Sequence, residues 1–176
     1  MKQSEFFPKQ QKAYGGLLLN TRAGRSHGRP LSSKNSMHLV LRSTRAKGAL
    51  SFLKHRATID RILEKFARKN GVRILSLANV GNHLHIEVRL STRHTYRAFI
   101  RAITAAIAMA VQGKSRWNKI EEKFWDYRPF TRIVVGYKAL LSLKDYIEIN
   151  DLEGLGVARS KSQLALGWRV VRPPGI

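Results

Sequence analysis

Two histidines spaced two residues apart are the first residues in this sequence that could do chemistry together. Residues 81–90 read GNHLHIEVRL, in which His83, His85 and Glu87 alternate with apolar side chains. In a β-strand, residues i and i+2 lie on the same side, about 6.5–7 Å apart, so two imidazoles can converge on one divalent cation. The same spacing also occurs on polar strand faces that only contact water, so the pair alone leaves both interpretations open.

A tyrosine and an asparagine one helical turn apart form a second candidate group. Tyr146 and Asn150 belong to the segment KDYIEIN, and their i, i+4 spacing places them on one face of a helix. A tyrosine hydroxyl can act as a covalent nucleophile. A cation held by imidazoles and an oxygen ligand can polarise a phosphate. Taken alone, Tyr146 is better explained as a half-buried helix tyrosine whose hydroxyl contacts water.

The hydrophobic pattern predicts the elements that would position these residues. Period-2 alternation predicts strands, and apolar residues at helical spacing predict helices. The expected strands cover residues 37–43, 72–80, 83–90 and 132–135, and the expected helices cover 52–70, 94–112 and 138–149.

The first six of these elements follow the ferredoxin-like split βαβ order, which predicts an α+β fold. Its antiparallel sheet carries two helices on one face and has its first and third strands in the centre. The third helix, which bears the tyrosine, is an addition at the C-terminal end. The apolar residues of 83–90 would face the two helices, and the two histidines and Glu87 would face the open side.

The charge of the chain favours a polyanionic partner. The 176 residues include 33 Lys and Arg against 11 Asp and Glu, a formal net charge of +22. Nucleic acid is the leading candidate for such a partner. The chain has no cysteine, which excludes disulfides, thiolate metal sites and cysteine nucleophiles.

The sequence predicts a cytoplasmic protein with no membrane partner, associated with the nucleoid when bound to DNA. The longest run of low polarity, residues 103–111, is far shorter than the roughly 20 residues of a membrane span. The composition divides the chain into a basic N-terminal arm (1–36), one domain (37–156) and a basic C-terminal tail (157–176). The arm is expected to have little regular structure and either orders on a nucleic acid or is a plain flexible tail.

Basic and aromatic side chains supply candidate DNA contacts. Lys and Arg side chains neutralise phosphates and make affinity depend on salt. Exposed aromatic rings stack on bases, at roughly 1–3 kcal/mol each. Trp117, between Arg116 and Lys119, is the better stacking candidate, whereas Trp125 and Phe130 are expected in the core. The arginines predicted to contact DNA are Arg25, Arg29, Arg42, Arg89 and Arg93.

Two non-enzymatic classes compete with a catalytic one. An RNA-recognition domain has the same strand order, but it needs stacking aromatics on the open faces of its first and third strands. Here those faces carry His38 and Arg42 on the first strand and the two histidines on the third, which argues against that class. A basic ribosomal or architectural protein would explain the charge but not the histidine, tyrosine and asparagine set.

The chain resembles the HUH single-tyrosine transposases of the IS200-like superfamily, and especially the REP-associated tyrosine transposases. The resemblance runs from about Arg29 to Gly156. A His-hydrophobic-His motif alone is weakly specific for this family. The ordered set of segments, with a tyrosine helix about sixty residues after the motif, is a much more specific signature. The segments that carry it are GRPLSSKNSMHLVLRS, ANVGNHLHIEV, FWDYRPFTRIV and DYIEINDLEGLG. Many REP-associated members have proline after the asparagine, where this chain has Asp151.

This resemblance implies a mechanism and a set of roles. His83 and His85 would bind a divalent metal, Mg²⁺ or Mn²⁺, with Asn150 as third ligand; Glu87, on the same strand face, is the alternative. Tyr146 would attack a phosphodiester of single-stranded DNA, forming a 5′-phosphotyrosine link and releasing a 3′-hydroxyl. Relatives often recognise hairpin DNA and occur as monomers and homodimers. The alternative is a catalytically silent, domesticated nucleic-acid-binding protein of the same fold.

Overall fold

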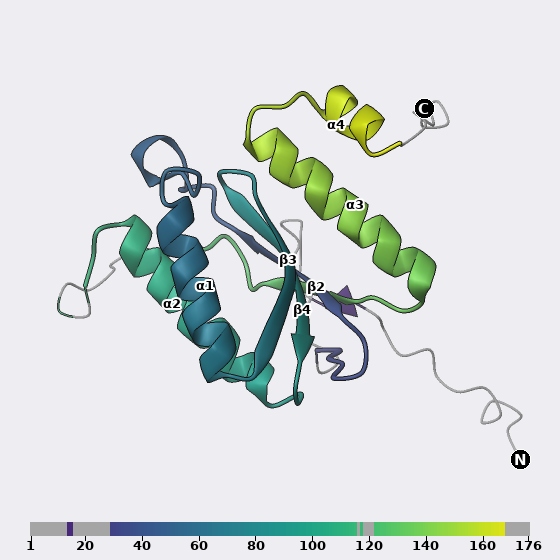
Figure 1. Ribbon diagram of the computed structural model, residues 1–176. Helices are drawn as coiled ribbons and strands as arrows, with labels where there is room; N and C mark the ends of the chain where they lie inside the picture. Colours follow the sequence, from purple (N-terminus) through teal and green to yellow (C-terminus); the bar gives the residue numbers. More distant parts are fainter. Residues whose placement is uncertain (1–13, 16–28, 116, 118–121, 168–176) are drawn as a thin grey trace, which may run out of the picture.

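One antiparallel sheet forms the centre of the protein (Figure 1). The computed structural model describes residues 14–15, 29–115, 117 and 122–167. The spatial order of the strands is β1-β5-β2-β4-β3, so β2 and β4 lie side by side in the middle, as the sequence predicts. The strands are β1 (Tyr14–Gly15), β2 (Met37–Arg42), β3 (Val72–Asn79), β4 (His83–Leu90) and β5 (Phe130–Ile133).

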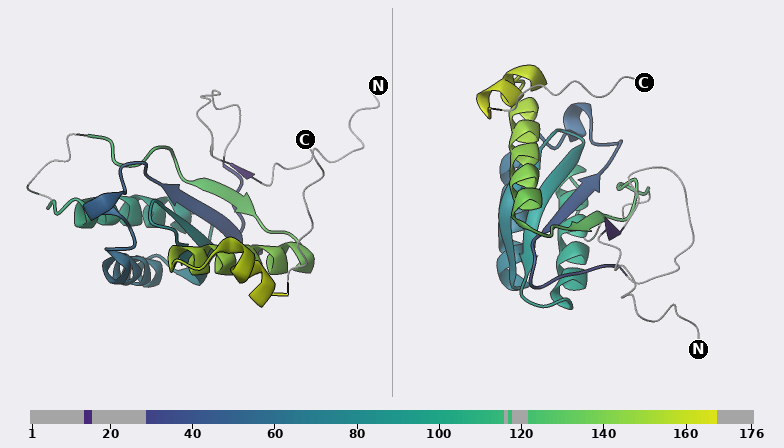
Figure 2. Two further views of the ribbon diagram at one scale, coloured as in Figure 1. Left: turned by 90° about the horizontal axis from the view of Figure 1, so that it is seen from above. Right: turned by 90° about the vertical axis from the view of Figure 1, so that its right-hand side faces the viewer.

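Helices cover both faces of this sheet (Figures 1 and 2). On one face lie α1 (Arg56–Lys69) and α2 (Thr95–Val111), and on the other lies α3 (Tyr137–Gly154). The short α4 (Arg159–Ala165) contacts α3, and a 3-10 turn, η2 (Gly48–Leu50), precedes α1. From β2 to β5 the elements follow the ferredoxin-like order, which confirms the predicted α+β fold.

The alternation of β2 and β4 separates an apolar face from a polar one. Leu84, Ile86, Val88 and Leu90 of β4 are buried against α1 and α2. Burying one such side chain contributes about 1.5–3 kcal/mol, so this face accounts for much of the driving force for folding. The intervening residues, His83, His85 and Glu87, therefore lie on the opposite face, which α3 partly covers.

The turn between β3 and β4 determines where α1 begins. The backbone N–H of Phe52 donates to the carbonyl of Gly81 (2.7 Å), and Asn79 Nδ2 donates to the carbonyl of Phe52 (2.8 Å). Because these bonds hold residue 52 against the turn, the helix predicted from residue 52 begins four residues later, at Arg56.

The last strand and the tyrosine helix also differ from the predicted bounds. β5 covers Phe130–Ile133 rather than 132–135, because Phe130 to Ile133 pair with β2 and Val134 then donates to the carbonyl of Ser36. α3 continues to Gly154 instead of ending at 149, and Gly156, with φ +87°, follows its end. Asp151 lies within the helix and forms an ion pair with Arg56 (2.5 Å).

Regular structure extends beyond the domain predicted at 37–156. In the basic arm, β1 pairs with β5, with Tyr14 opposite Arg132. In the basic tail, residues 159–165 form α4, whose Arg159 is ion-paired with Glu153 of α3. In the described part of the chain, no helix is long and apolar enough to cross a membrane.

At Gly154 the backbone of α3 lies close against the end of β3. A Cβ built on this residue would lie 2.2 Å from the carbonyl oxygen of Asn79, a backbone atom that cannot move aside alone. We therefore expect Gly154→Ala to destabilise the fold by about 1–3 kcal/mol. In a helix without this contact the same change stabilises by up to about 1 kcal/mol, so the sign is diagnostic. Urea unfolding of both proteins measures it, and a more stable variant would contradict the contact.

Tyr96 of α2 offers a second test of the packing. Its hydroxyl is buried without a hydrogen-bond partner, and the Arg29 guanidinium lies 5.7 Å from its ring centre. We expect Tyr96→Phe to stabilise the protein by about 1 kcal/mol at pH 7, because an unsatisfied buried hydroxyl is removed.

The advantage of Tyr96→Phe should grow at alkaline pH. Burial raises the pKa of Tyr96 to about 12, against the opposing effect of Arg29. Above pH 10 the unfolded tyrosine ionises while the folded one stays protonated, so wild-type stability falls between pH 10 and 12. Urea unfolding at pH 7, 10 and 11 tests this. A difference between the two proteins that does not change with pH would contradict it.

Candidate active site

Three imidazoles and one phenol meet between the sheet and α3. His83 and His85 come from β4, His38 from β2 and Tyr146 from α3. The ring centre of His85 lies 4.7 Å from the ring centre of His83, 5.1 Å from that of Tyr146 and 5.3 Å from that of His38. His38 also contacts Tyr146 edge-on, at 5.9 Å. The pair of histidines and the tyrosine singled out in the sequence are thus brought together within one chain.

His38 is the member of this cluster that the sequence reasoning did not assign to the site. Alternation along β2 placed it on the polar face, but only the register shows which residues it meets. His38 lies opposite Glu87, and Val40 lies opposite His85. The imidazole of His38 reaches diagonally across this pair, so that its Nε2 lies 3.1 Å from Nδ1 of His85.

The Nδ1 atoms of both β4 histidines have hydrogen-bond partners. Nδ1 of His83 lies 2.5 Å from Oδ1 of Asn82, to which it donates, and Nδ1 of His85 lies against His38. The Nε2 atoms are left for another ligand. That of His85 is buried without a hydrogen-bond partner. Metal-binding histidines commonly have this arrangement, with one nitrogen held by the protein and the other directed at the cation.

Burial keeps these imidazoles neutral at ordinary pH. It lowers the pKa of His85 to about 3, with further lowering from His38 and His83, and that of His38 to about 4, assisted by Arg132. The pKa of His83 is also lowered, first by burial and then by Arg42. A neutral imidazole has a free lone pair, which is the form that a cation requires.

Asn150 lies one turn beyond Tyr146 and is also buried. Its Nδ2 donates to the carbonyl of Tyr146 (2.6 Å), which leaves Oδ1 as the atom that could bind a cation. Gly154 of the same helix lies on Asn79, which pairs with Leu84 near the start of β4. Because α3 runs toward that end of β4, Asn150 is displaced from Tyr146 in the direction of His83.

Glu87 lies on the other side of His85 along β4. It is fully buried; Oε2 accepts a hydrogen bond from Ser76 (3.1 Å), and Oε1 has no partner. Glu87 is thus displaced from His85 in the direction opposite to His83, away from the end of β4 to which α3 carries Asn150. If His83 and His85 hold a cation, this placement favours Asn150 over Glu87 as its third ligand.

The donor set fits a divalent cation only if the amide takes part. Among the residues that the structure describes, no three His, Cys, Asp or Glu side chains are grouped so that they could hold a metal ion. The unpartnered Nε2 of His85 is what a cation would satisfy. Two imidazoles and an amide oxygen, completed by water, form an acceptable set for Mn²⁺ or Mg²⁺.

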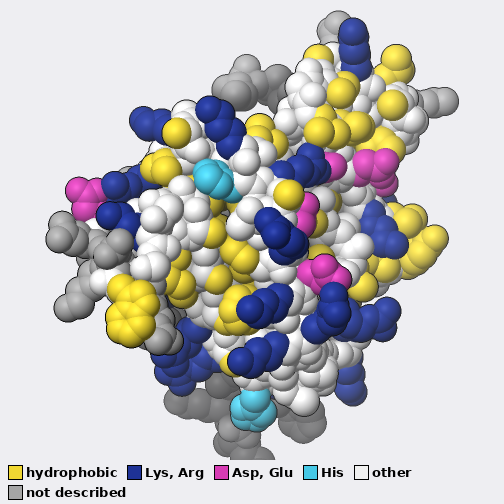
Figure 3. All heavy atoms as spheres, turned by 60° about the vertical axis from the view of Figure 1, so that its left-hand side comes forward, with side chains coloured by type: hydrophobic (Ala, Val, Ile, Leu, Met, Phe, Trp, Pro, Cys, Tyr) yellow, Lys and Arg dark blue, Asp and Glu magenta, His cyan; other side chains and the backbone are white. Residues whose placement is uncertain are grey.

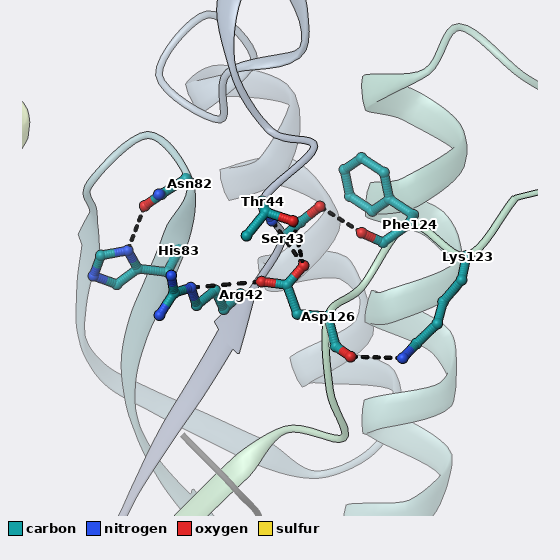
Figure 4. A network of polar contacts seen from close by, with 8 residues as sticks. All are labelled: Arg42, Ser43, Thr44, Asn82, His83, Lys123, Phe124 and Asp126. Carbon is teal, nitrogen blue, oxygen red and sulfur yellow. Dashed lines mark hydrogen bonds and ion pairs between the residues drawn. The ribbon is translucent and has the colours of Figure 1, made fainter. Parts of the chain in front are cut away.

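A polar network joins the end of β2 to the segment before β5, and His83 lies beside it (Figure 4). Arg42, opposite His83 in register, forms an ion pair with Asp126 (3.5 Å). Asp126 Oδ1 also accepts from the backbone N–H (2.8 Å) and the hydroxyl (2.9 Å) of Thr44. Ser43 Oγ donates to the carbonyl of Phe124 (2.5 Å). Arg42 is thus held beside His83 while half of its side chain stays exposed.

The other residues predicted to contact DNA have different surroundings. Arg29 donates to the carbonyl of Pro129 (2.5 Å) and to Thr131 Oγ1 (2.9 Å), so it ties the arm to β5. Arg89 and Arg93 are exposed, and Arg89 donates to the carbonyl of Lys34 (3.2 Å). Trp117 is 78% exposed. Arg25, Arg116 and Lys119 lie outside the described residues.

One basic residue beside the cluster was missed. Arg132 of β5 lies opposite His38, is exposed, and contributes to the lowered pKa of that histidine. Its position opposite His38 follows from the pairing of β5 with β2. The sequence predicted this strand at 132–135 and gave no register for it, so the neighbour of Arg132 could not be identified.

Basic side chains also cover the side of the molecule on which α1 and α2 lie, as Figure 3 shows. The exposed face of α2 carries Arg97 and Arg101, and this helix has no acidic residue. On α1, four exposed basic side chains outnumber one exposed acidic side chain, Glu64: Arg61, Lys65, Arg68 and Lys69. The positive charge is therefore not confined to the polar face of the sheet.

Comparisons with known proteins bear on the family and on the fold. The profile of the family described as "Transposase IS200 like" matches residues 32–150. The fold is similar to a solved REP-associated tyrosine transposase bound to a REP hairpin, with a TM-score of 0.61 and 15% identity over 87% of this chain and 93% of that one. A protein of Deinococcus radiodurans R1 assigned as a transposase gives a TM-score of 0.43 and 18% identity, over 73% of this chain and 96% of that one. No curated protein matches the chain.

Asp126 should contribute more to stability than its ion pair alone. In Asp126→Ala, the ion pair and both bonds from Thr44 are lost, and we expect a loss of about 1–3 kcal/mol. In Arg42→Ala only the half-exposed ion pair is lost, for which we expect about 0–1 kcal/mol. Urea unfolding ranks the two variants. Equal losses would mean that the Thr44 bonds contribute nothing.

Proposed function

Since the chain belongs to the family of IS200-like transposases, we propose that it cleaves and rejoins single-stranded DNA through a covalent bond to Tyr146. The observation that carries this proposal is the edge-on contact between the rings of Tyr146 and His85, whose centres lie 5.1 Å apart. This contact places the proposed nucleophile beside a proposed cation ligand. Both residues, with His38 and His83, come from the same chain, so this arrangement needs no residue from a second copy.

The proposed reaction exchanges one phosphodiester for another. The Tyr146 oxygen attacks the phosphorus, the bond to the 3′ oxygen breaks, and the tyrosine proton ends on the released 3′-hydroxyl. A 5′-phosphotyrosine link remains. Attack on that link by a 3′-hydroxyl, of the same strand or another, regenerates the tyrosine and joins DNA ends. No oxidant or nucleotide is consumed, because each step replaces one ester bond with another.

A divalent cation, Mg²⁺ or Mn²⁺, bound by His83, His85 and Asn150 would neutralise charge on the attacked phosphate. The chain's own contribution is to hold these three side chains and the tyrosine ring in a fixed relation. The Nδ1 contacts of both histidines fix the ring planes, and the bond from Asn150 to the Tyr146 carbonyl fixes the amide.

Exposed arginines around the cluster would hold the DNA strand. Arg42 flanks His83 and Arg132 flanks His38. These two arginines would contact phosphates next to the scissile one. Arg89 and Arg93 lie at the far end of the histidine strand. The REP hairpin in the similar solved structure supports hairpin DNA as the partner. Contacts of this kind make affinity fall steeply with salt.

A DNA-binding protein without catalysis is the second candidate. It is favoured by one observation: among the described residues the cluster lacks a third His, Cys, Asp or Glu placed to hold a metal. In that case the fold and the basic surface would serve binding alone, and neither the tyrosine nor the histidines would affect it.

A covalent-adduct gel distinguishes the two candidates. Purified protein is incubated with Mg²⁺ or Mn²⁺ and hairpin oligonucleotides whose sequences are taken from the flanks of its own gene. We expect a denaturant-resistant protein–DNA band that requires the metal. Tyr146→Phe lacks the oxygen that forms the ester, so the band should disappear while hairpin binding stays unchanged. His83→Ala/His85→Ala should also remove the band.

The matched control is Tyr137→Phe, which alters an exposed tyrosine at the start of the same helix. This variant should form the adduct like the wild type. An adduct that survives Tyr146→Phe would place the nucleophile elsewhere. Tight hairpin binding without any adduct, indifferent to metal and to both sets of mutations, would favour the binding protein.

A further inference from the structure

His38 contacts both the proposed nucleophile, Tyr146, and one of the proposed metal ligands, His85. Its ring lies nearly parallel to that of His85, at an interplanar angle of 22°, with the facing nitrogens 3.1 Å apart, and it meets the Tyr146 ring edge-on. A third ring, Phe130 of β5, packs edge-on against it at 6.3 Å. His38 is 8% exposed, so these contacts leave its imidazole little freedom to turn.

The contact between His38 and His85 holds a single proton. Between Nε2 of His38 and Nδ1 of His85, one nitrogen donates and the other accepts. If His38 donates, His85 must carry its own proton on Nε2, which is buried with no acceptor. If His85 donates from Nδ1, its Nε2 presents a lone pair instead. Only this second tautomer can bind a cation through Nε2.

The neighbouring histidine follows the same pattern with a different partner. Nδ1 of His83 donates to Oδ1 of Asn82, which cannot donate in return, so Nε2 of His83 is unprotonated. An acceptor at Nδ1 of each histidine would therefore direct two lone pairs toward the same side of β4. His38 would do for His85 what an amide oxygen does for His83.

We propose that His38 is a positioning residue, which accepts the Nδ1 proton of His85 and so fixes the tautomer and ring plane in which His85 binds the divalent cation. This proposal rests on the proposed function, because it assigns His38 to the same metal site. His38 acts through His85 and needs no contact of its own with the cation. Its edge-on contact with Tyr146 keeps the tyrosine ring beside the ligand that it orients.

Two substitutions separate the hydrogen bond from the packing. His38→Phe keeps a ring of similar size against Tyr146 and Phe130 but removes the acceptor. His38→Gln restores an acceptor, Oε1, at about the position of the imidazole Nε2. The matched control is His94→Phe, which alters an exposed histidine before α2 that has no part in the cluster.

The first measurement is the tautomer of His85 in the metal-free wild type, by ¹⁵N-resolved NMR of the imidazole rings. We expect the proton on Nδ1. A proton on Nε2 would overturn the proposal without any variant, so the test stands even if a substitution impairs folding. His38→Phe should lose the fixed Nδ1 tautomer, and His38→Gln should keep it.

The second measurement is Mn²⁺ affinity by calorimetry, without DNA or turnover. We expect His38→Phe to weaken binding by about 10- to 100-fold, the usual effect of losing a group that orients a ligand. His38→Gln should stay within about threefold of the wild type, as should His94→Phe. Wild-type affinity in His38→Phe would overturn the role of His38 alone. A wild type that binds no Mn²⁺, either alone or with a hairpin oligonucleotide added, would overturn the proposed metal chemistry, and with it the orienting role.

Discussion

The burial of polar side chains between the sheet and α3 is the constraint on which the rest of the site depends. On this face, β2 and β4 present His38, His85 and Glu87, each at most 8% exposed. Burying a polar group without a partner costs a few kcal/mol, so each imidazole and carboxyl needs a neighbour. His38 and His85 are neighbours of each other, and Ser76 of β3 donates to Glu87. Two buried atoms, Nε2 of His85 and Oε1 of Glu87, still have none.

The stability needed to keep these polar side chains buried comes from the opposite face of the same strands. The side chains of β4 that alternate with the histidines are buried among α1, α2 and β2. Because the side-chain period of a strand is two, the register that buries Leu84 and Ile86 also fixes the direction of His83 and His85. A slip by one residue would expose the apolar set and bury the wrong side chains. The histidine face is therefore positioned largely by the apolar core on the opposite side of the sheet.

The sequence was sufficient for the properties that depend on local periodicity. Alternation over 83–90 located the strand without error at either end, and the turn at Gly81 and Asn82 identified the hairpin. The bounds of α1, β5 and α3 were wrong where tertiary contacts decide them: Phe52 bound to the hairpin turn, β5 paired with β2, and Gly154 packed on Asn79.

The same distinction explains the outcome for the candidate site. His83, His85 and Tyr146 were found because each lies in a short motif whose spacing carries information. His38 and Arg132 were not assigned to it, because what brings them there is cross-strand register, His38 to His85 on one side and Arg132 to His38 on the other. A register is a relation between segments distant in the chain, and periodicity within one segment does not contain it.

The net charge of +22 acts on the two proposed ligands of the site in opposite directions. It attracts DNA, but it repels a divalent cation, and Arg42 and Arg132 both lie near the histidines. Neutral imidazoles can bind a cation, but they do not cancel its charge. A phosphate at the site would supply the missing negative charge for the cation and for both arginines. The arrangement therefore favours joint binding of cation and DNA over binding of the cation alone, so a protein this basic can still use metal chemistry when its polyanionic substrate is present.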